Sequence, residues 1–399
     1  MNPLFLSHDA SQTGAPVVLL NYLRWLRAQT HSDPVVLLGG AGPRLQDFED
    51  TSRCLLAKHA PFQLTRPTPA ARFSKEWTAR QMSRLKPQGR IPGAPELSTV
   101  EFDLVYANTV ATGPLYNALP STSGLRDLPL VVHVHEQAST IKQHEETWQA
   151  KSILERADFI IAASQSVADQ LVLNFQVPTS HIEVINEFID RPAQNPDCIE
   201  VRELFGIPKV APIITGAGSI GFRKGFDLFC SAAVQILRDW GQKSPMSEAP
   251  HFIWLGAGNS DLIHWAKHDL HTAGYDQHLH LPGLVPSIAP YLAVSSVFAM
   301  PSREDPFPLV NIEAGLHGLP VVAFNDSGGS ADYVSKTGGR MVRYGDTVAM
   351  ASEITSLLEP ACWNQSDRDR ATAAVVKNFT TDSQAPKIFK LLEGLVRTH

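Results

Sequence analysis

The stretch "SREDPFPLVNIEAGLHGLPVV" (residues 302–322) places two carboxylates, Asp305 and Glu313, eight positions apart around the predicted start of a helix. An apolar run, "SVFAMP" (residues 296–301), comes directly before it and is typical of a buried strand. Pro308 falls just before or at the first helical turn, where the missing N–H of proline has no cost. The stretch therefore predicts a strand, a loop and a helix in that order.

The start of this helix is a predicted anion site. The N–H groups of Leu309 and Val310 would point out of the helix, where the helix dipole favours negative charge, and a diphosphate fits there. Glu313 lies one turn inside and could reach a ribose hydroxyl, while Asp305 on the loop could accept hydrogen bonds from sugar hydroxyls. An acid in a first helical turn is also ordinary dipole complementation, so the spacing alone leaves both interpretations open.

Length and composition predict a two-domain globular protein. The chain has 399 residues, more than one ordinary core holds, and 43% of them are hydrophobic and 19% charged. It contains no apolar window long enough to span a membrane, and its N-terminus lacks the pattern of a signal peptide. The four cysteines are scattered without a C-x-x-C pair, which argues against a zinc site or a disulfide scaffold. We therefore expect a cytoplasmic protein.

Positive charge is concentrated in residues 51–95, which contain nine Lys or Arg against the single acid Glu76. One interpretation is a solvated basic helix face. Another is a surface for an anionic acceptor, or for peripheral binding to the acidic inner face of a membrane. Phe73 and Trp77 lie four positions apart, as a membrane-resting amphipathic helix and ordinary core packing both require. No nucleic-acid-binding motif accompanies this charge, so we do not expect nucleic acid as a partner.

Short apolar runs alternate with helix-period segments along the chain, a pattern typical of parallel sheets covered by helices. In the first half we predict strands over residues 3–7, 33–39, 102–108, 128–135 and 158–164, and helices over residues 15–29 and 164–175. In the second half we predict strands over residues 211–218, 251–258, 278–283, 296–301, 319–324 and 338–342, and a final helix over residues 383–396. The segment over residues 86–97 is predicted to be a surface loop.

The predicted fold class is α/β, with two doubly wound Rossmann-like domains facing an inter-domain cleft. The first domain covers residues 1–195 and the second residues 205–375, and "DRPAQNPD" between them has the composition of a linker. Two segments, "FLSHDASQTGAPVVLL" and "IITGAGSIGFRKGFDLF", each predict a strand, a glycine-bearing loop and a helix. Such loops lie at the carboxyl edge of a doubly wound sheet, where ligands bind.

The sequence "PSREDPFPLVNIEAGLHGLPVVAF" closely resembles the donor-binding signature of retaining glycosyltransferases of family 4, which have the two-domain GT-B architecture. The signature of that family is Glu-x7-Glu. Here Asp305 is the first acid and Glu313 the second, and Pro306 and Pro308 replace two glycines. The shorter aspartate alters the reach of the first acid, and the adjacent Glu304 leaves its assignment open.

Two other segments of the second half resemble parts of the same family. "GAGSIGFRKGFDLF" is similar to the family's diphosphate-binding loop, and Lys224 matches the lysine of that loop. Ser219 stands near the place of the family's arginine, and Arg223 is a candidate to replace it because a guanidinium can chelate a diphosphate. Leu284 and Val285 fall where backbone groups of the family meet the nucleobase.

The first half resembles the acceptor side of the family. "SHDASQTGAPVVLLNYL" is similar to the loop that approaches the transferred sugar and the acceptor, with Gly14 matching one glycine and Ala15 standing in place of the next. "LPLVVHVHE" places His135 where the family keeps a histidine at a strand end, and we rank His133 below it. The resemblance also implies that the C-terminal helix, within residues 376–399, crosses back to the first domain.

The resemblance implies a retaining, metal-independent transfer of a hexose from a nucleoside diphosphate sugar to a hydroxyl of a glycan, lipid-linked or small-molecule acceptor, with no cofactor. The implied catalytic residues are His135, Asp305, Lys224 and Glu313. The implied donor-binding residues are Gly14, Ala15, Ser219, Arg223, Lys224, Leu284, Val285, Phe307, Pro308, Leu309, Val310 and Glu313.

Two other functions remain as alternatives. A non-catalytic protein of this architecture would hold a sugar nucleotide or a partner subunit, and the replaced arginine and Asp305 keep that interpretation open. A GT-B sugar-nucleotide epimerase would share the architecture but not this signature, so we rank it last.

Overall fold

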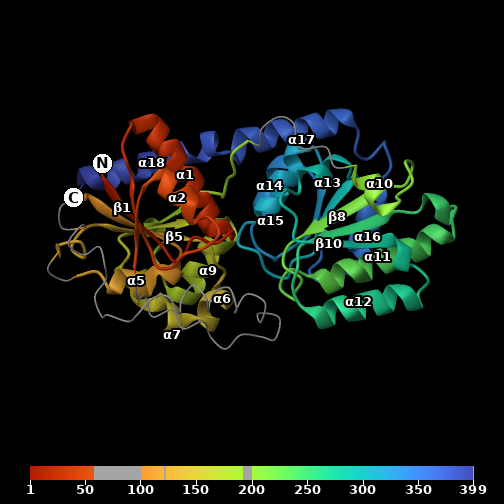
Figure 1. Cartoon of the computed structure of the whole chain (residues 1–399), viewed down its shortest axis with the longest axis horizontal. Coiled ribbons are helices and arrows are strands. Elements are labelled where there is room, and N and C mark those ends of the chain that lie inside the picture. The colour runs from red at the N-terminus through yellow and green to blue at the C-terminus, as the bar shows by residue number, and fades with distance from the viewer. Residues whose placement is uncertain (58–96, 98–99, 121–122, 192–199, 399) are drawn as a thin grey trace. The chain divides into compact units, whose positions relative to one another are not determined.

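The computed structural model describes residues 1–57, 97, 100–120, 123–191 and 200–398 (Figure 1). The chain divides into two units, Met1–Asp190 with Thr380–His399, and Arg191–Phe379. Most of the basic stretch over residues 51–95, the loop predicted over residues 86–97 and most of the predicted linker lie outside the described residues.

The first unit is built on a parallel sheet with the strand order β3-β2-β1-β4-β5-β6-β7. Its strands are β1 Pro3–Ser7, β2 Val35–Leu38, β3 Arg53–Leu56, β4 Leu104–Asn108, β5 Leu130–Val134, β6 Phe159–Ala162 and β7 Ile182–Val184. The inner strands are buried on both faces, which explains why each reads as a continuous apolar run. The order of the strands reverses between β1 and β4, so the chain leaves these two neighbouring strands in opposite directions along the sheet.

Helices pack around this first sheet. They are α1 Gly14–Thr30, α2 Leu45–Thr51, α5 Gly113–Asn117, α6 Ala138–Gln143, α7 Glu145–Trp148, α8 Ala150–Arg156, α9 Gln165–Phe175 and α18 Thr381–Thr398. The start of α9 is fixed by Ser164, whose hydroxyl accepts the N–H of Val167. The C-terminal helix α18 packs on α1, where the rings of Trp25 and Phe389 lie 5.9 Å apart (Figure 1). The last helix therefore belongs to the first unit.

The second unit has a parallel sheet with the order β10-β9-β8-β11-β12-β13. Its strands are β8 Ile213–Ala217, β9 His251–Leu255, β10 Leu279–Gly283, β11 Val297–Met300, β12 Val321–Phe324 and β13 Arg340–Val342. Its helices are α10 Val201–Phe205, α11 Phe226–Gly241, α12 Ser260–Thr272, α13 Ala289–Ala293, α14 Leu309–Leu316, α15 Ser330–Thr337, α16 Thr347–Leu357 and α17 Gln365–Asn378. The core under α11 is aromatic, with the rings of Phe229 and Trp254 5.2 Å apart.

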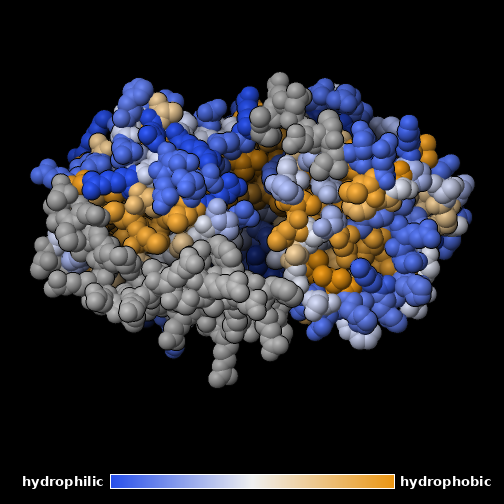
Figure 2. Space-filling view, in the orientation of Figure 1, coloured by the Kyte–Doolittle hydropathy of each residue, from blue (hydrophilic) through white to orange (hydrophobic). Residues whose placement is uncertain are grey.

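The predicted α/β fold with two doubly wound sheets is confirmed, and every predicted strand is present within a few residues. Two edge strands, β3 and β7, were not predicted from the sequence. Among the described residues, no helix is both long and apolar enough to cross a membrane. Figure 2 shows hydrophobic surface on the visible face of the second unit, whose exposed apolar side chains include Phe222 and Leu284.

Candidate active site

In the second unit, the loops that follow β8 and β11 meet at the point where the strand order reverses. The backbone N–H of Arg303 donates to the carbonyl of Arg223 at 2.9 Å, and Nη1 of Arg223 donates to the carbonyl of Glu304 at 3.0 Å. Both predicted ligand loops are therefore tied to each other at the carboxyl edge of the sheet.

Arg303 and a glycine fix the loop that is predicted to bind a diphosphate, at its junction with α11. The guanidinium of Arg303 makes two hydrogen bonds to the carboxylate of Asp227, at 2.8 and 2.7 Å, in the first turn of α11. These bonds raise the pKa of Arg303. Gly225 has a φ of 72°, and a Cβ there would lie 1.9 Å from the carbonyl oxygen of Pro301. Only glycine fits this turn, which explains the Lys-Gly pair at the end of the loop.

The lysine expected at the diphosphate lies beside the acid expected at the transferred sugar. The ammonium of Lys224 forms an ion pair with the carboxylate of Asp305, and these side chains are 18% and 8% exposed. The backbone of Asp305 is bonded on both sides, since its N–H donates to the carbonyl of Ser327 at 2.8 Å and its carbonyl accepts from the N–H of Gly329 at 3.0 Å. Glu304 is less buried. This geometry favours Asp305 over Glu304 as the first acid of the signature.

Helix α14 begins beside this ion pair. Pro308 is the residue before its first turn, has an extended backbone, and provides no side-chain cap for the N–H groups of Leu309 and Val310. Glu313 lies one turn further and keeps partial solvent contact. Burial raises the pKa of Glu313 to about 7. Among the residues that the structure describes, none forms a hydrogen bond with its carboxylate, which leaves that group available for a ligand hydroxyl.

The other expected donor residues differ in what they can offer. Ser219 and Arg223 are exposed, Leu284 is 83% exposed at the end of β10, and Val285 is partly buried. Phe307 is only 3% exposed, and its ring lies 5.4 Å from the ring of Phe379 in the core of the second unit. Phe307 can therefore meet a donor only through its backbone.

In the first unit, His135 belongs to a chain of buried hydrogen bonds. Its Nδ1 lies 2.8 Å from Oε1 of Glu187, and its Nε2 lies 2.9 Å from Oδ1 of Asn108. Nδ2 of Asn108 donates to the carbonyl of Ala15 at 2.9 Å. This chain joins the start of α1, the end of β4, the end of β5 and the segment after β7, all at the carboxyl edge of the first sheet.

Titratable groups surround this chain. The hydroxyl of Thr109 and the backbone N–H of His135 both donate to the carboxylate of Glu136, whose pKa burial nonetheless raises. Nδ1 of His133 lies 2.6 Å from the hydroxyl of Tyr106, and burial holds the pKa of His133 well below its usual value. Thr109 has a φ of 89°, which is strained for a β-branched residue. Such strain is typical of a functional loop.

Sequence reasoning missed several of these groups. Asn108 ends a predicted strand but was not singled out, and Glu187 follows the unpredicted strand β7. His8, whose pKa burial lowers, lies in the loop after β1 near His135. A polar residue at the end of a predicted strand was the available signal for Asn108. Nothing local marked Glu187.

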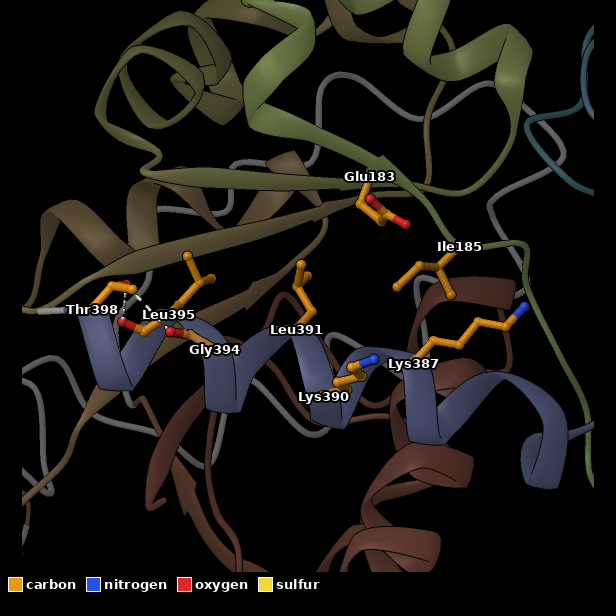
Figure 3. Close-up of a pocket in the computed structure, with 8 residues that line it drawn as sticks. All are labelled: Glu183, Ile185, Lys387, Lys390, Leu391, Gly394, Leu395 and Thr398. Atoms are coloured by element: carbon orange, nitrogen blue, oxygen red, sulfur yellow. Dashed lines mark hydrogen bonds between the residues drawn. The ribbon is translucent and has the colours of Figure 1, made fainter.

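The structure also contains a groove of about 520 Å³ between β7 and α18 of the first unit (Figure 3). Its walls carry apolar side chains and two lysines, and the lining residues are Glu183, Ile185, Lys387, Lys390, Leu391, Gly394, Leu395 and Thr398. None of the site residues predicted from the sequence lines this groove, so we do not assign it to the active site. Within the described ranges, no cluster of three or more His, Cys, Asp or Glu side chains is arranged to hold a metal ion.

Both units match family models of known enzymes. Residues 13–191 match the model "Glycosyltransferase Family 4" and residues 211–360 match the model "Glycosyl transferases group 1". The chain therefore belongs to the group 1, family 4 glycosyltransferases of GT-B fold.

Individual relatives agree with this family. The chain is 27% identical to the lipopolysaccharide core biosynthesis mannosyltransferase LpsB of Rhizobium meliloti, over 68% of this chain and 76% of the relative. It is 23% identical to D-inositol 3-phosphate glycosyltransferase 1 of Catenulispora acidiphila, over 83% of this chain and 79% of that one. The crystal structure of Anabaena HepE in complex with UDP-glucose covers 99% of this chain and 100% of its own, with a TM-score of 0.73 and 20% identity. That likeness shows the fold.

Proposed function

We propose that this protein transfers a hexose from a nucleoside diphosphate sugar to a hydroxyl of a glycan or lipid-linked acceptor, with retention of anomeric configuration. The observation that carries the proposal is the convergence on one edge of the second sheet of Lys224, Asp305, the uncapped start of α14 and the carboxylate of Glu313, to which no described residue forms a hydrogen bond. A diphosphate, a sugar and a ribose each find a complementary group there.

The roles follow from charge. Lys224 and the N–H groups of Leu309 and Val310 would stabilise the negative charge that develops on the departing diphosphate. Asp305 would accept a hydrogen bond from a hydroxyl of the transferred sugar, and Glu313 would accept hydrogen bonds from the ribose. Because Lys224 and the helix start supply the positive charge, we propose a reaction that needs no metal, and activity that survives a chelator would support this.

The relatives guide the choice of donor and acceptor. HepE was crystallised with UDP and with UDP-glucose, and LpsB is named as a mannosyltransferase of lipopolysaccharide core synthesis. We therefore propose a nucleoside diphosphate hexose as donor and a glycan or glycolipid as acceptor. Peripheral contact with an anionic membrane through the basic stretch over residues 51–95 remains part of this proposal, and salt-sensitive binding to acidic vesicles tests it.

The test is a thermal-shift panel of UDP, GDP, ADP and dTDP and their hexose conjugates, followed by an assay of sugar transfer with the donor that binds. A ligand at 100 times its Kd adds about 2.7 kcal/mol of stability. Stabilisation by one base together with formation of an α- or β-linked product that matches the donor anomer would support the proposal. Binding without donor turnover would instead favour a non-catalytic sugar-nucleotide binder.

A further inference from the structure

His135 is held between two oxygen atoms that can both accept hydrogen bonds. Oε1 of Glu187 lies 2.8 Å from Nδ1 and Oδ1 of Asn108 lies 2.9 Å from Nε2. The side chains of His135 and Glu187 are 3% and 4% exposed, so water does not substitute for either partner. A neutral imidazole has only one N–H, so this arrangement needs an additional proton.

The orientation of the Asn108 amide determines that Nε2 of His135 carries a hydrogen. Its Nδ2 donates to the carbonyl oxygen of Ala15 at 2.9 Å. If the amide were flipped, its oxygen would face that carbonyl oxygen and no hydrogen could lie between them. Oδ1 therefore faces His135, and Nε2 donates an N–H to it.

The other ring nitrogen shares a proton with Glu187. Because an imidazole binds a proton more tightly than a carboxylate does, Nδ1–H donates to the carboxylate of Glu187, and the pair is neutral overall. A neutral buried pair avoids the cost of a lone buried carboxylate, which is large. Glu187 and Asp305, whose side chains are 4% and 8% exposed, are each matched by a basic side chain.

The neighbours of the pair favour this charge arrangement. The titratable groups that face it are His8 after β1, Tyr106 on β4, His133 on β5 and Glu136 after β5. Burial lowers the pKa of His133 and, against the opposing effect of Asp9, that of His8, which favours the neutral form of both rings. Tyr106 also stays neutral because burial raises its pKa.

We propose that Glu187 is a positioning residue that holds His135 with a hydrogen in each of its two ring contacts, so that the ring offers no free basic nitrogen and cannot act as a base. The activity part of this inference rests on the proposed function, and the protonation part does not. Asn108 fixes the same ring from the opposite side and connects it to the loop at the start of α1.

The test compares Glu187→Gln with Glu183→Gln, a matched loss of one carboxylate from an exposed position of β7. The first readout is the ring ¹⁵N NMR signal of His135 in the full chain. Wild type and Glu183→Gln should show no unprotonated, acceptor-type ring nitrogen, whereas Glu187→Gln should leave a neutral ring with one N–H. Glu187→Asp keeps the carboxylate and should restore the wild-type signal.

The second readout is transfer. Glu187→Gln should lower kcat about 10²-fold with a smaller change in KM, while Glu183→Gln changes neither. A wild-type His135 with a free basic nitrogen, or the same ring signal in Glu187→Gln as in wild type, would overturn the inference. If no donor is turned over, the proposed function fails, and the NMR comparison still decides the role of Glu187.

Discussion

Glu313→Gln tests the proposed donor site, because it should raise the stability of the protein and weaken the binding of nucleotide. Burial raises the pKa of Glu313 from 4.5 to about 7 in the folded protein. The folded state therefore holds this proton more tightly than the unfolded state, and stability is lost as the pH rises from 4.5 to about 7. Glutamine has nearly the same shape and carries no charge, so the variant avoids this loss.

The expected gain in the free energy of unfolding follows from the change in the pKa of Glu313. The change in pKa corresponds to about 3 kcal/mol, and we take about 2 to 3 kcal/mol because the carboxyl keeps some solvent contact. For a unit of this size that is a rise of roughly 4 to 10 °C in the Tm of the second unit at pH 8. At pH 4 the two proteins should melt together, because Glu313 is protonated in both states.

Nucleotide binding should change in the other direction. Loss of a charge-assisted hydrogen bond to a ribose hydroxyl costs about 1.5 to 3 kcal/mol, so the variant should bind its nucleoside diphosphate roughly 10- to 100-fold more weakly. Thermal melts at several pH values, with and without nucleotide, measure both effects. Glu359→Gln, at an exposed position of the same unit, is the control. A variant that is no more stable than wild type at pH 8, or that binds nucleotide as tightly, would refute the reasoning.

Three further predictions concern the second unit. Lys224→Ala should lower transfer by more than about 10²-fold, measured as product formed at saturating donor, because in the proposed reaction its charge stabilises the leaving diphosphate. Gly225→Ala should lower the Tm of the unit and weaken diphosphate binding, because its φ is 72° and its Cβ would clash with the Pro301 carbonyl. Burial lowers the pKa of His251 and of His280 to about 4. The free energy of unfolding should therefore fall by about 1 to 2 kcal/mol for each of these histidines as the pH drops from 6.5 towards 4. Thermal melts of His280→Gln at several pH values should show a smaller fall.

Two of these predictions have a control variant in the same unit, and the third compares His280→Gln with wild type. Lys243→Ala removes an exposed lysine and should leave transfer unchanged. Gly221→Ala lies in the same loop as Gly225, where a Cβ meets no atom within 4 Å, and should be tolerated. Full transfer by Lys224→Ala, equal melts of the two glycine variants, or identical acid melts of His280→Gln and wild type would contradict the respective explanation.

The sequence predicted the buried strands well and the edge strands poorly. β1, β4 and β5 are rich in apolar residues because helices cover both faces of their sheet. β3 and β7 were missed because they are short, partly exposed and lack an apolar run. An edge strand buries less surface and makes hydrogen bonds on one side only, so its sequence is less constrained.

The candidate site was predictable where one short segment holds several of its parts. Pro308 and Glu313 belong to one loop and helix, and Gly225 is required by a local turn. The contacts of Lys224 with Asp305 and of His135 with Glu187 join residues 81 and 52 positions apart. No local pattern encodes such pairs, since they depend on the order of strands in each sheet.

The position of α18 affects how the chain can fold during synthesis. This helix buries Ile388 and Leu392 in the first unit, although all of Arg191–Phe379 is translated between them and the rest of that unit. The second unit is continuous in sequence and can complete its core as soon as it has left the ribosome. The first unit must wait with the α18-binding surface of α1 uncovered. The first unit is therefore translated first but completes its folding last. It is the unit whose uncovered surface a chaperone would need to protect.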